Sequence, residues 1–225
     1  MAAYRGWVLA AAVAAFALPV SAPAFAAVIT PTSVVASSQL SGLGRNAINT
    51  INGSGLTGSG HGVDPTTMWL STGNGAAGGT PDPTPSITFD LGSVKSLTGA
   101  QIWNYNESGG TNRGVLSFNF SSSLDGITYT SPTSFTLTAA TGTAGDLAQV
   151  VSVTASAEFV RLSGLTSGDS DGLVGLSEVR FVTANAITDA AEVPEPSSMA
   201  LLIVGLVGCV FAVRRSQFTA TTLKA

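Results

Sequence analysis

The fold is decided by Ile102-Trp103-Asn104-Tyr105-Asn106-Glu107, a stretch near the middle of the chain that is followed by Arg113-Gly114-Val115. Alternate side chains of an extended chain point to opposite faces, so Trp103 and Tyr105 share one face. The strand then runs into a polar end that carries Asn106, Glu107 and Arg113. This set suits hydrogen bonding and ring stacking rather than catalysis. Two interpretations of Trp103 and Tyr105 stay open, because they can pack between two sheets or face a ligand.

Short segments with strand-like alternation lie on both sides of this stretch, separated by turn-forming residues. The pair Asp125-Gly126 is typical of a type I′ hairpin, and Gly- and Ser-rich loops occupy 37–62 and 73–85. The pattern contains no amphipathic helix of useful length and predicts an all-β sandwich or jelly roll. The predicted strands cover 28–36, 86–92, 97–104, 115–121, 127–129, 134–139, 149–153, 157–162 and 176–182.

The first 26 residues have the features of a signal peptide. Arg5 precedes an apolar run, and Ala24-x-Ala26 predicts cleavage after Ala26, with an uncleaved membrane anchor as the alternative. The expected domains are a signal peptide over 1–26, a β-sandwich over 27–183, a linker over 184–193 and an apolar C-terminal segment over 194–225.

The region between these terminal segments is acidic. Residues 28–192 hold five Lys/Arg and twelve Asp/Glu, a net charge of 5 − 12 = −7. An acidic domain without a basic run argues against nucleic acid and anionic lipid headgroups as partners. The only cysteine, Cys209, lies in the C-terminal apolar run, so the predicted sandwich has no disulfide.

The C-terminus carries Pro194-Glu195-Pro196, an apolar run over 199–213, and Arg214-Arg215. In this order the three features resemble the PEP-CTERM sorting signal. The resemblance implies a protein exported by a Gram-negative bacterium, with signal peptidase and exosortase as processing enzymes. The chain would be anchored transiently in the inner membrane, through this segment alone, and then released to the cell surface or extracellular matrix.

The central region resembles the discoidin, or F5/8 type C, family. The segments that carry the likeness are 87–92, 102–106, 113–115, 122–126, 159–162 and 175–181. The resemblance implies a galactose-binding-like jelly roll that binds carbohydrate or phospholipid and is accessory rather than enzymatic. The chain departs from the family in lacking the disulfide that joins the domain ends, in its glycine-rich loop between Gly53 and Trp69, and in lacking apolar lipid-binding spikes.

Many sugar-binding members of that family hold one structural Ca²⁺ ion, and the matching positions here are Asn52, Thr57 and Glu178. Calcium takes about six to eight oxygen ligands, so Asn in place of Asp supplies an oxygen but less charge. In the alternative interpretation the loop is a solvated turn and Glu178 pairs with Arg180 or Arg161.

The candidate ligand residues are His61, Trp69, Asn106, Glu107 and Arg113, which combine an aromatic platform with polar groups for hydroxyls. Core packing is the alternative for Trp69, and a structural role is the alternative for Arg113. Since His61 is the only histidine and has no orienting partner nearby in the sequence, we expect no enzyme. The predicted function is non-catalytic binding of extracellular polysaccharide or matrix glycan. The alternatives are a structural matrix protein without a ligand site and a glycan-processing enzyme.

Overall fold

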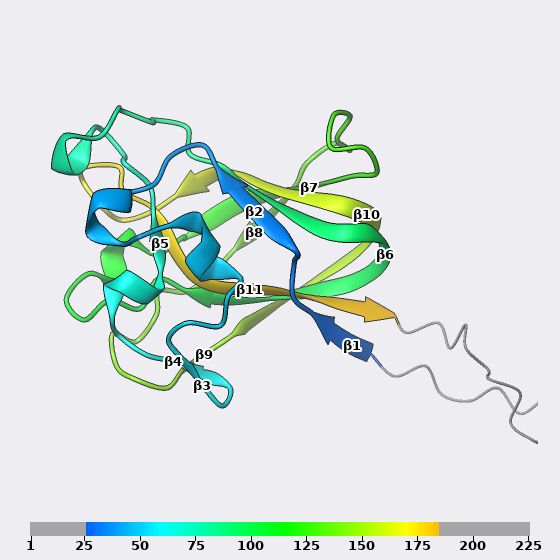
Figure 1. The fold of residues 1–225 in the computed structure, drawn as a ribbon, viewed down its shortest axis with the longest axis horizontal. Helices are drawn as coiled ribbons and strands as arrows, with labels where there is room; N and C mark the ends of the chain where they lie inside the picture. The colour runs from blue at the N-terminus through cyan, green and yellow to red at the C-terminus, as the bar shows by residue number, and fades with distance from the viewer. Residues whose placement is uncertain (1–25, 185–225) are drawn as a thin grey trace, which may run out of the picture. The chain divides into compact units, whose positions relative to one another are not determined.

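The computed structural model describes residues 26–184, and they form an all-β fold with short 3-10 turns in its loops (Figure 1). The predicted signal peptide, linker and sorting segment lie outside the described residues, except for Ala26 and Ala184. Within 26–184, no helix is long and apolar enough to span a membrane. The strands are β1 (Ala26–Ile29), β2 (Ser33–Ala36), β3 (Leu56–Thr57), β4 (Gly60–His61), β5 (Trp69–Leu70), β6 (Ile87–Asn104), β7 (Ser117–Ser123), β8 (Thr133–Thr136), β9 (Asp146–Leu147), β10 (Gln149–Thr166) and β11 (Gly175–Ala184). The 3-10 turns are η1 (Ser41–Leu43), η2 (Ala47–Thr50), η3 (Pro65–Thr67), η4 (Ala76–Gly78) and η5 (Thr111–Arg113).

The two longest strands hold the sandwich together. The main sheet runs β1-β11-β6-β10-β7-β8, with β2 added to β6 and β5 added to β11, and all of these pairs are antiparallel. The first part of β6 pairs with β2, and its last part pairs with β11. Figure 1 shows β6 and β10 curving together, so each strand contributes to both layers. The sequence predicted two separate strands in each of these places, with a stop at Gly92 in the first and a break over 154–156 in the second.

The bends depend on residues that interrupt regular pairing. Gly92 lies within β6 at φ +76°, a left-handed conformation that glycine adopts without a Cβ clash. Along β10 the pairing with β6 shifts register between Ser152 and Ala155 and again between Ala157 and Phe159. Such bulges bend a strand and increase its twist. The sheet can therefore fold over on itself without ending its longest strands.

The core lies between the two layers. It includes Trp69, Ile102, Phe89 and Phe181, each of which is no more than 1% exposed, and the rings of Phe89 and Phe181 meet edge to face. Trp103 and Tyr105 are also buried, at 5% and 0% exposure, which decides between the two interpretations of these residues in favour of packing.

The prediction of a tight hairpin at Asp125-Gly126 is wrong. Only Gly126 has a positive φ, whereas a type I′ turn requires it at both central residues. The Asp125 carboxylate instead accepts hydrogen bonds from the backbone N–H groups of Ile127 and Thr128, at 2.9 and 2.8 Å. Residues 127–129 consequently belong to a wider loop between β7 and β8.

Candidate functional site

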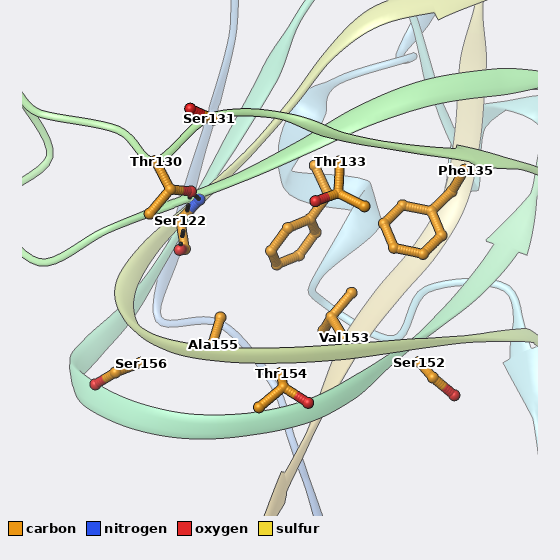
Figure 2. Close-up of a pocket in the computed structure, with 11 residues that line it drawn as sticks. Ser122, Thr130, Ser131, Thr133, Phe135, Ser152, Val153, Thr154, Ala155 and Ser156 are labelled. Atoms are coloured by element: carbon orange, nitrogen blue, oxygen red, sulfur yellow. Dashed lines mark hydrogen bonds between the residues drawn. The ribbon is translucent and has the colours of Figure 1, made fainter.

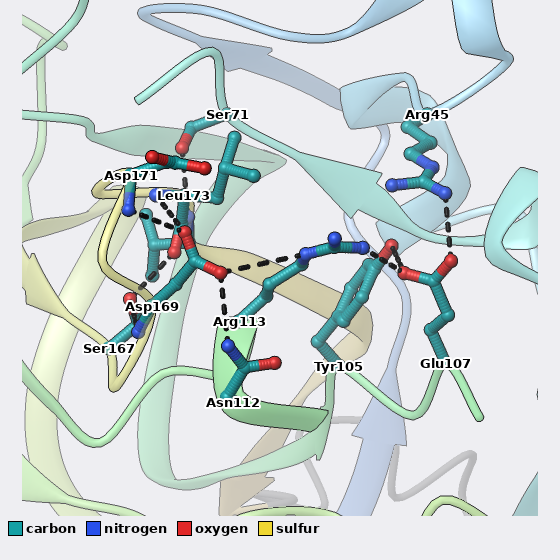
Figure 3. Close-up of polar contacts among 11 residues, drawn as sticks. Arg45, Ser71, Tyr105, Glu107, Asn112, Arg113, Ser167, Asp169, Asp171 and Leu173 are labelled. Carbon is teal, nitrogen blue, oxygen red and sulfur yellow. Dashed lines mark hydrogen bonds and ion pairs between the residues drawn. The ribbon is translucent and has the colours of Figure 1, made fainter. Parts of the chain in front are cut away.

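One end of the sandwich gathers the loops that follow β6 and precede β7 and β11. Because these strands are antiparallel neighbours of one another or of β10, the loops over 105–116 and 167–174 leave from the same end. We call the polar side chains at this place the loop-end cluster, and it consists of Arg45, Glu107, Asn112, Arg113 and Asp169 (Figure 3).

Glu107 is the centre of the loop-end cluster. Its Oε1 accepts a hydrogen bond from Arg45 Nη2 at 2.9 Å, and its Oε2 accepts one from Arg113 Nη1 at 2.6 Å. The hydroxyl of Tyr105 also donates to Oε2, at 2.8 Å. Burial, together with this hydrogen bond, raises the pKa of Tyr105 above its ordinary value, so the hydroxyl keeps its proton. The carboxylate is thus held by two cations and a buried phenol.

Arg113 links Glu107 to a second loop. Its Nε lies 3.7 Å from Asp169 Oδ2, and the same Asp169 oxygen accepts a hydrogen bond from Asn112 Nδ2 at 3.0 Å. The Arg113 side chain is 30% exposed, and Nη2 makes no hydrogen bond with any described residue. The cluster therefore holds an exposed amide, that of Asn112, and the partly exposed side chain of Arg113 in a fixed arrangement around two carboxylates that are already hydrogen-bonded.

The structure brings together only two of the five predicted ligand residues, Glu107 and Arg113. Trp69 is fully buried, and its indole N–H donates to the carbonyl of Ser38 at 2.9 Å. The expectation that Trp69 is an aromatic platform is wrong, because this side chain fills the core.

His61 and Asn106 are also fully buried, so their prediction as ligand contacts is wrong. The His61 ring nitrogens lie 3.0 Å from the carbonyl oxygens of Ser54 and Gly62. The Asn106 amide donates to the carbonyls of Gly62 and Thr143 and accepts from Gly142 N–H. Both side chains satisfy loop backbone that would otherwise be buried without partners.

The sequence did not predict three members of the cluster, Arg45, Asn112 and Asp169. Asn112 lies shortly after Glu107 in the loop that follows β6, so its place in the sequence could have indicated that it belongs to the cluster. Asp169 lies in an Asp- and Gly-rich segment, where Asp is expected in turns anyway. Arg45 lies 62 residues from Glu107, and only the sheet topology shows that they meet.

The three predicted calcium ligands do not form a cage as arranged. Glu178 is fully buried, its Oε2 accepts from Gly53 N–H at 3.2 Å, and its Oε1 lies 3.2 Å from Arg180 Nε. Asn52 uses its side-chain oxygen to cap Ser54 N–H, and Thr57 is exposed on β3. Among residues 26–184, no group of three or more His, Cys, Asp or Glu could hold a metal. The positive charge beside Glu178 comes from Arg180, and calcium binding stays a prediction of the sequence alone.

This architecture is that of a galactose-binding-like β-sandwich. The family description "F5/8 type C domain" matches residues 33–179, so the chain belongs to the F5/8 type C family. A second match, the PEP-CTERM protein-sorting motif, covers residues 192–216. That motif is typical of exported proteins that exosortase sorts in Gram-negative bacteria. No curated protein matches the chain significantly in sequence.

Solved structures with the same fold include several carbohydrate-binding modules. CpGH89CBM32-5 from Clostridium perfringens, solved with GalNAc-β-1,3-galactose, is 19% identical with a TM-score of 0.50, over 68% of this chain and 94% of that one. CBM32-3 from a family 31 glycoside hydrolase of the same organism is 18% identical with a TM-score of 0.51, over 69% and 94%. The C-terminal domain of a Bacteroides fragilis chitobiase is 17% identical with a TM-score of 0.50, over 69% and 96%. At these identities the likeness shows the fold.

Proposed function

We propose that the chain is a non-catalytic carbohydrate-binding module that recognises extracellular polysaccharide or matrix glycan outside a Gram-negative cell. The observation that carries the proposal is the loop-end cluster, in which Arg113 is fixed between Glu107 and Asp169 while part of its guanidinium stays exposed. Sugar hydroxyls both donate and accept hydrogen bonds, so the Asn112 amide, which can do both, and Arg113 Nη2, which bonds to no described residue, match them. The sorting motif supports export to a place where such glycans occur.

The cluster is better suited to binding than to catalysis. Glu107 already accepts three hydrogen bonds, from Arg45, Arg113 and Tyr105, so its carboxylate is occupied as a structural anchor. The single histidine is buried against backbone carbonyls in another loop. A calcium ion takes no part in this proposal.

The test is a glycan array probed with the purified protein, followed by titration of any hit with Asn112→Ala. Asn119→Ala is the matched control, because Asn119 lies on β7 outside the cluster. Each of the two asparagines makes one side-chain hydrogen bond: Asn112 bonds to Asp169, and Asn119 bonds to Ser134. We expect Asn112→Ala to weaken binding about tenfold, as loss of one or two hydrogen bonds to a ligand predicts. A blank array with folded protein would favour the structural matrix role, and equal losses in both variants would remove the cluster from the site.

A further inference from the structure

A second recess lies at the flank of the sandwich, where neither layer has a further strand. Along β10, pairing with β7 begins at Phe159, so the earlier part of β10 pairs with β6 on one side and with no described strand on the other. In the opposite layer, β8 is likewise the last strand of the sheet. Between these two edges is a cleft of about 420 Å³, which we call the edge cleft (Figure 2). Its volume falls within the roughly 300–1,000 Å³ of small-molecule sites.

The side chains that point into the edge cleft are mostly apolar. Figure 2 shows Thr133 and Phe135 on one wall facing Val153 and Ala155 on the other. Phe120 also lines it, at 5% exposure, and its ring meets that of Phe135 edge to face with centroids 6.4 Å apart. The shift in register between Ser152 and Ala155 bends β10 here. A ligand in the cleft would therefore contact the rim of the hydrophobic core.

The lining of the cleft is rich in Ser and Thr and carries no charge. The residues that line it are four apolar ones and seven Ser or Thr. Figure 2 shows Ser152, Thr154 and Ser156 pointing away from the cleft, on the face of β10 opposite Val153 and Ala155. The hydroxyls of Ser131 and Thr133 make no hydrogen bond within residues 26–184, whereas Ser122 and Thr130 bond to each other at 3.3 Å.

The exposed aromatic surface of the described region is concentrated near this cleft. Of its ten aromatic side chains, only Tyr129, Phe135 and Phe159 are more than slightly exposed. Tyr129 lines a neighbouring hollow that shares Ser122 with the edge cleft, and the Arg161 guanidinium stacks on its ring at 4.1 Å. By contrast, Tyr105 at the loop-end cluster is fully buried. The exposed aromatic rings are thus in a different place from the loop-end cluster.

From these observations we propose that the edge cleft is a second glycan-binding site, specific for a neutral sugar. This inference adds a site to the proposed function, and the two sites share no residue. A neutral sugar ring has an apolar C–H face, which fits the apolar side chains of Phe135, Val153 and Ala155. Its peripheral hydroxyls fit the hydroxyls of Ser122, Thr130 and Thr133. An acidic sugar would meet no cation in the lining. A protein partner fits less well, because protein hot spots favour Trp, Tyr and Arg over Ser and Thr.

The test is a titration of isotopically labelled protein with short neutral gluco-, galacto-, manno- and xylo-oligosaccharides, with oligogalacturonate as the acidic counterpart. We expect a neutral probe to shift the amide resonances of Val153 and Ala155, and we expect Thr133→Lys to weaken its binding at least about tenfold. Thr136→Lys is the matched control, since this exposed Thr lies on the same strand but does not line the cleft. A second variant, Ala155→Met, fills the cleft from the opposite wall and should have the same effect if Thr133→Lys perturbs folding.

The outcomes separate this site from the loop-end cluster. Shifts confined to residues 107–113 would overturn the edge cleft and leave the proposed function standing. No shift with any neutral probe would overturn the edge cleft, and no shift with any probe, oligogalacturonate included, at either place would overturn both proposals. Shifts at Val153 that Thr136→Lys abolishes as strongly as Thr133→Lys would also overturn the cleft. Saturable binding of an extended peptide in place of sugars would reassign it as a strand-addition site.

Discussion

Replacing Glu178 with Gln should reveal a carboxyl group that opposes folding at neutral pH. Burial raises the pKa of Glu178 to about 7 from its ordinary 4.5, against the opposing effects of Gly53 N–H and Arg180. The folded chain therefore binds a proton more tightly than the unfolded chain. The stability that this group contributes is present below about pH 4.5 and is lost as the pH rises through about 7. A difference of 7 − 4.5, or about 2.5 pH units, at about 1.4 kcal/mol each corresponds to about 3 kcal/mol.

The assay is urea unfolding of wild type and Glu178→Gln across this pH range, with the free energy of unfolding extrapolated to water. Gln imitates the protonated carboxyl, so the stability of the variant relative to wild type should increase by up to about 3 kcal/mol from low to neutral pH. Glu158→Gln, which changes a partly exposed carboxylate on β10, controls for removing one negative charge. Parallel curves for wild type and Glu178→Gln would refute the reasoning, because they would mean that Glu178 is equally easy to ionise in both states.

Three further predictions concern buried groups. Trp69→Ala should lower the free energy of unfolding by about 3–5 kcal/mol in a denaturant melt, because it leaves a large cavity in the core. A loss near zero would mean that the Trp69 side chain is not buried in the core. Asn106→Ala should cost about 2–4 kcal/mol, because the carbonyls of Gly62 and Thr143 lose their donors, and Asn119→Ala, on the exposed side of β7, should cost clearly less in the same melt. Calcium should leave the Tm unchanged while Arg180 pairs with Glu178; a Tm that climbs with Ca²⁺ and falls back with chelator would restore the calcium site.

Much of the fold could be predicted from the sequence, because strand periodicity and turn residues are local signals. The strands around Phe89, Ile102, Phe118 and Phe181 all lie where alternation placed them. The continuity of β6 through Gly92 could not be predicted in this way. Glycine is typical of a strand end, whereas here Gly92 bends the strand in a left-handed conformation and β10 pairs with β6 both before it, at Asp90, and after it, at Lys95.

The candidate site was less predictable than the fold. Polar and aromatic residues at the end of a strand indicate a ligand site, but the same residues can hold loops together. Asn106 and His61 do the latter, since each is surrounded by backbone carbonyls that require a donor. Whether such a side chain faces solvent depends on loops far away in sequence, as the pair of Arg45 and Glu107 shows.

The pairing of β1 with β11 has a consequence for the order of events during export. Ala26 is opposite Ala184, and Ile29 is opposite Phe181, so the first strand finds its partner only in the last. Contacts so distant in sequence form slowly, because the entropy cost of closing a long loop comes before the contacts can stabilise the chain. A chain threaded from its N-terminus would keep β1 unpaired until almost the whole domain had crossed the membrane. The sandwich would then close in one late step, which joins the strand next to the predicted signal-peptide cleavage point to the strand that leads towards the sorting motif.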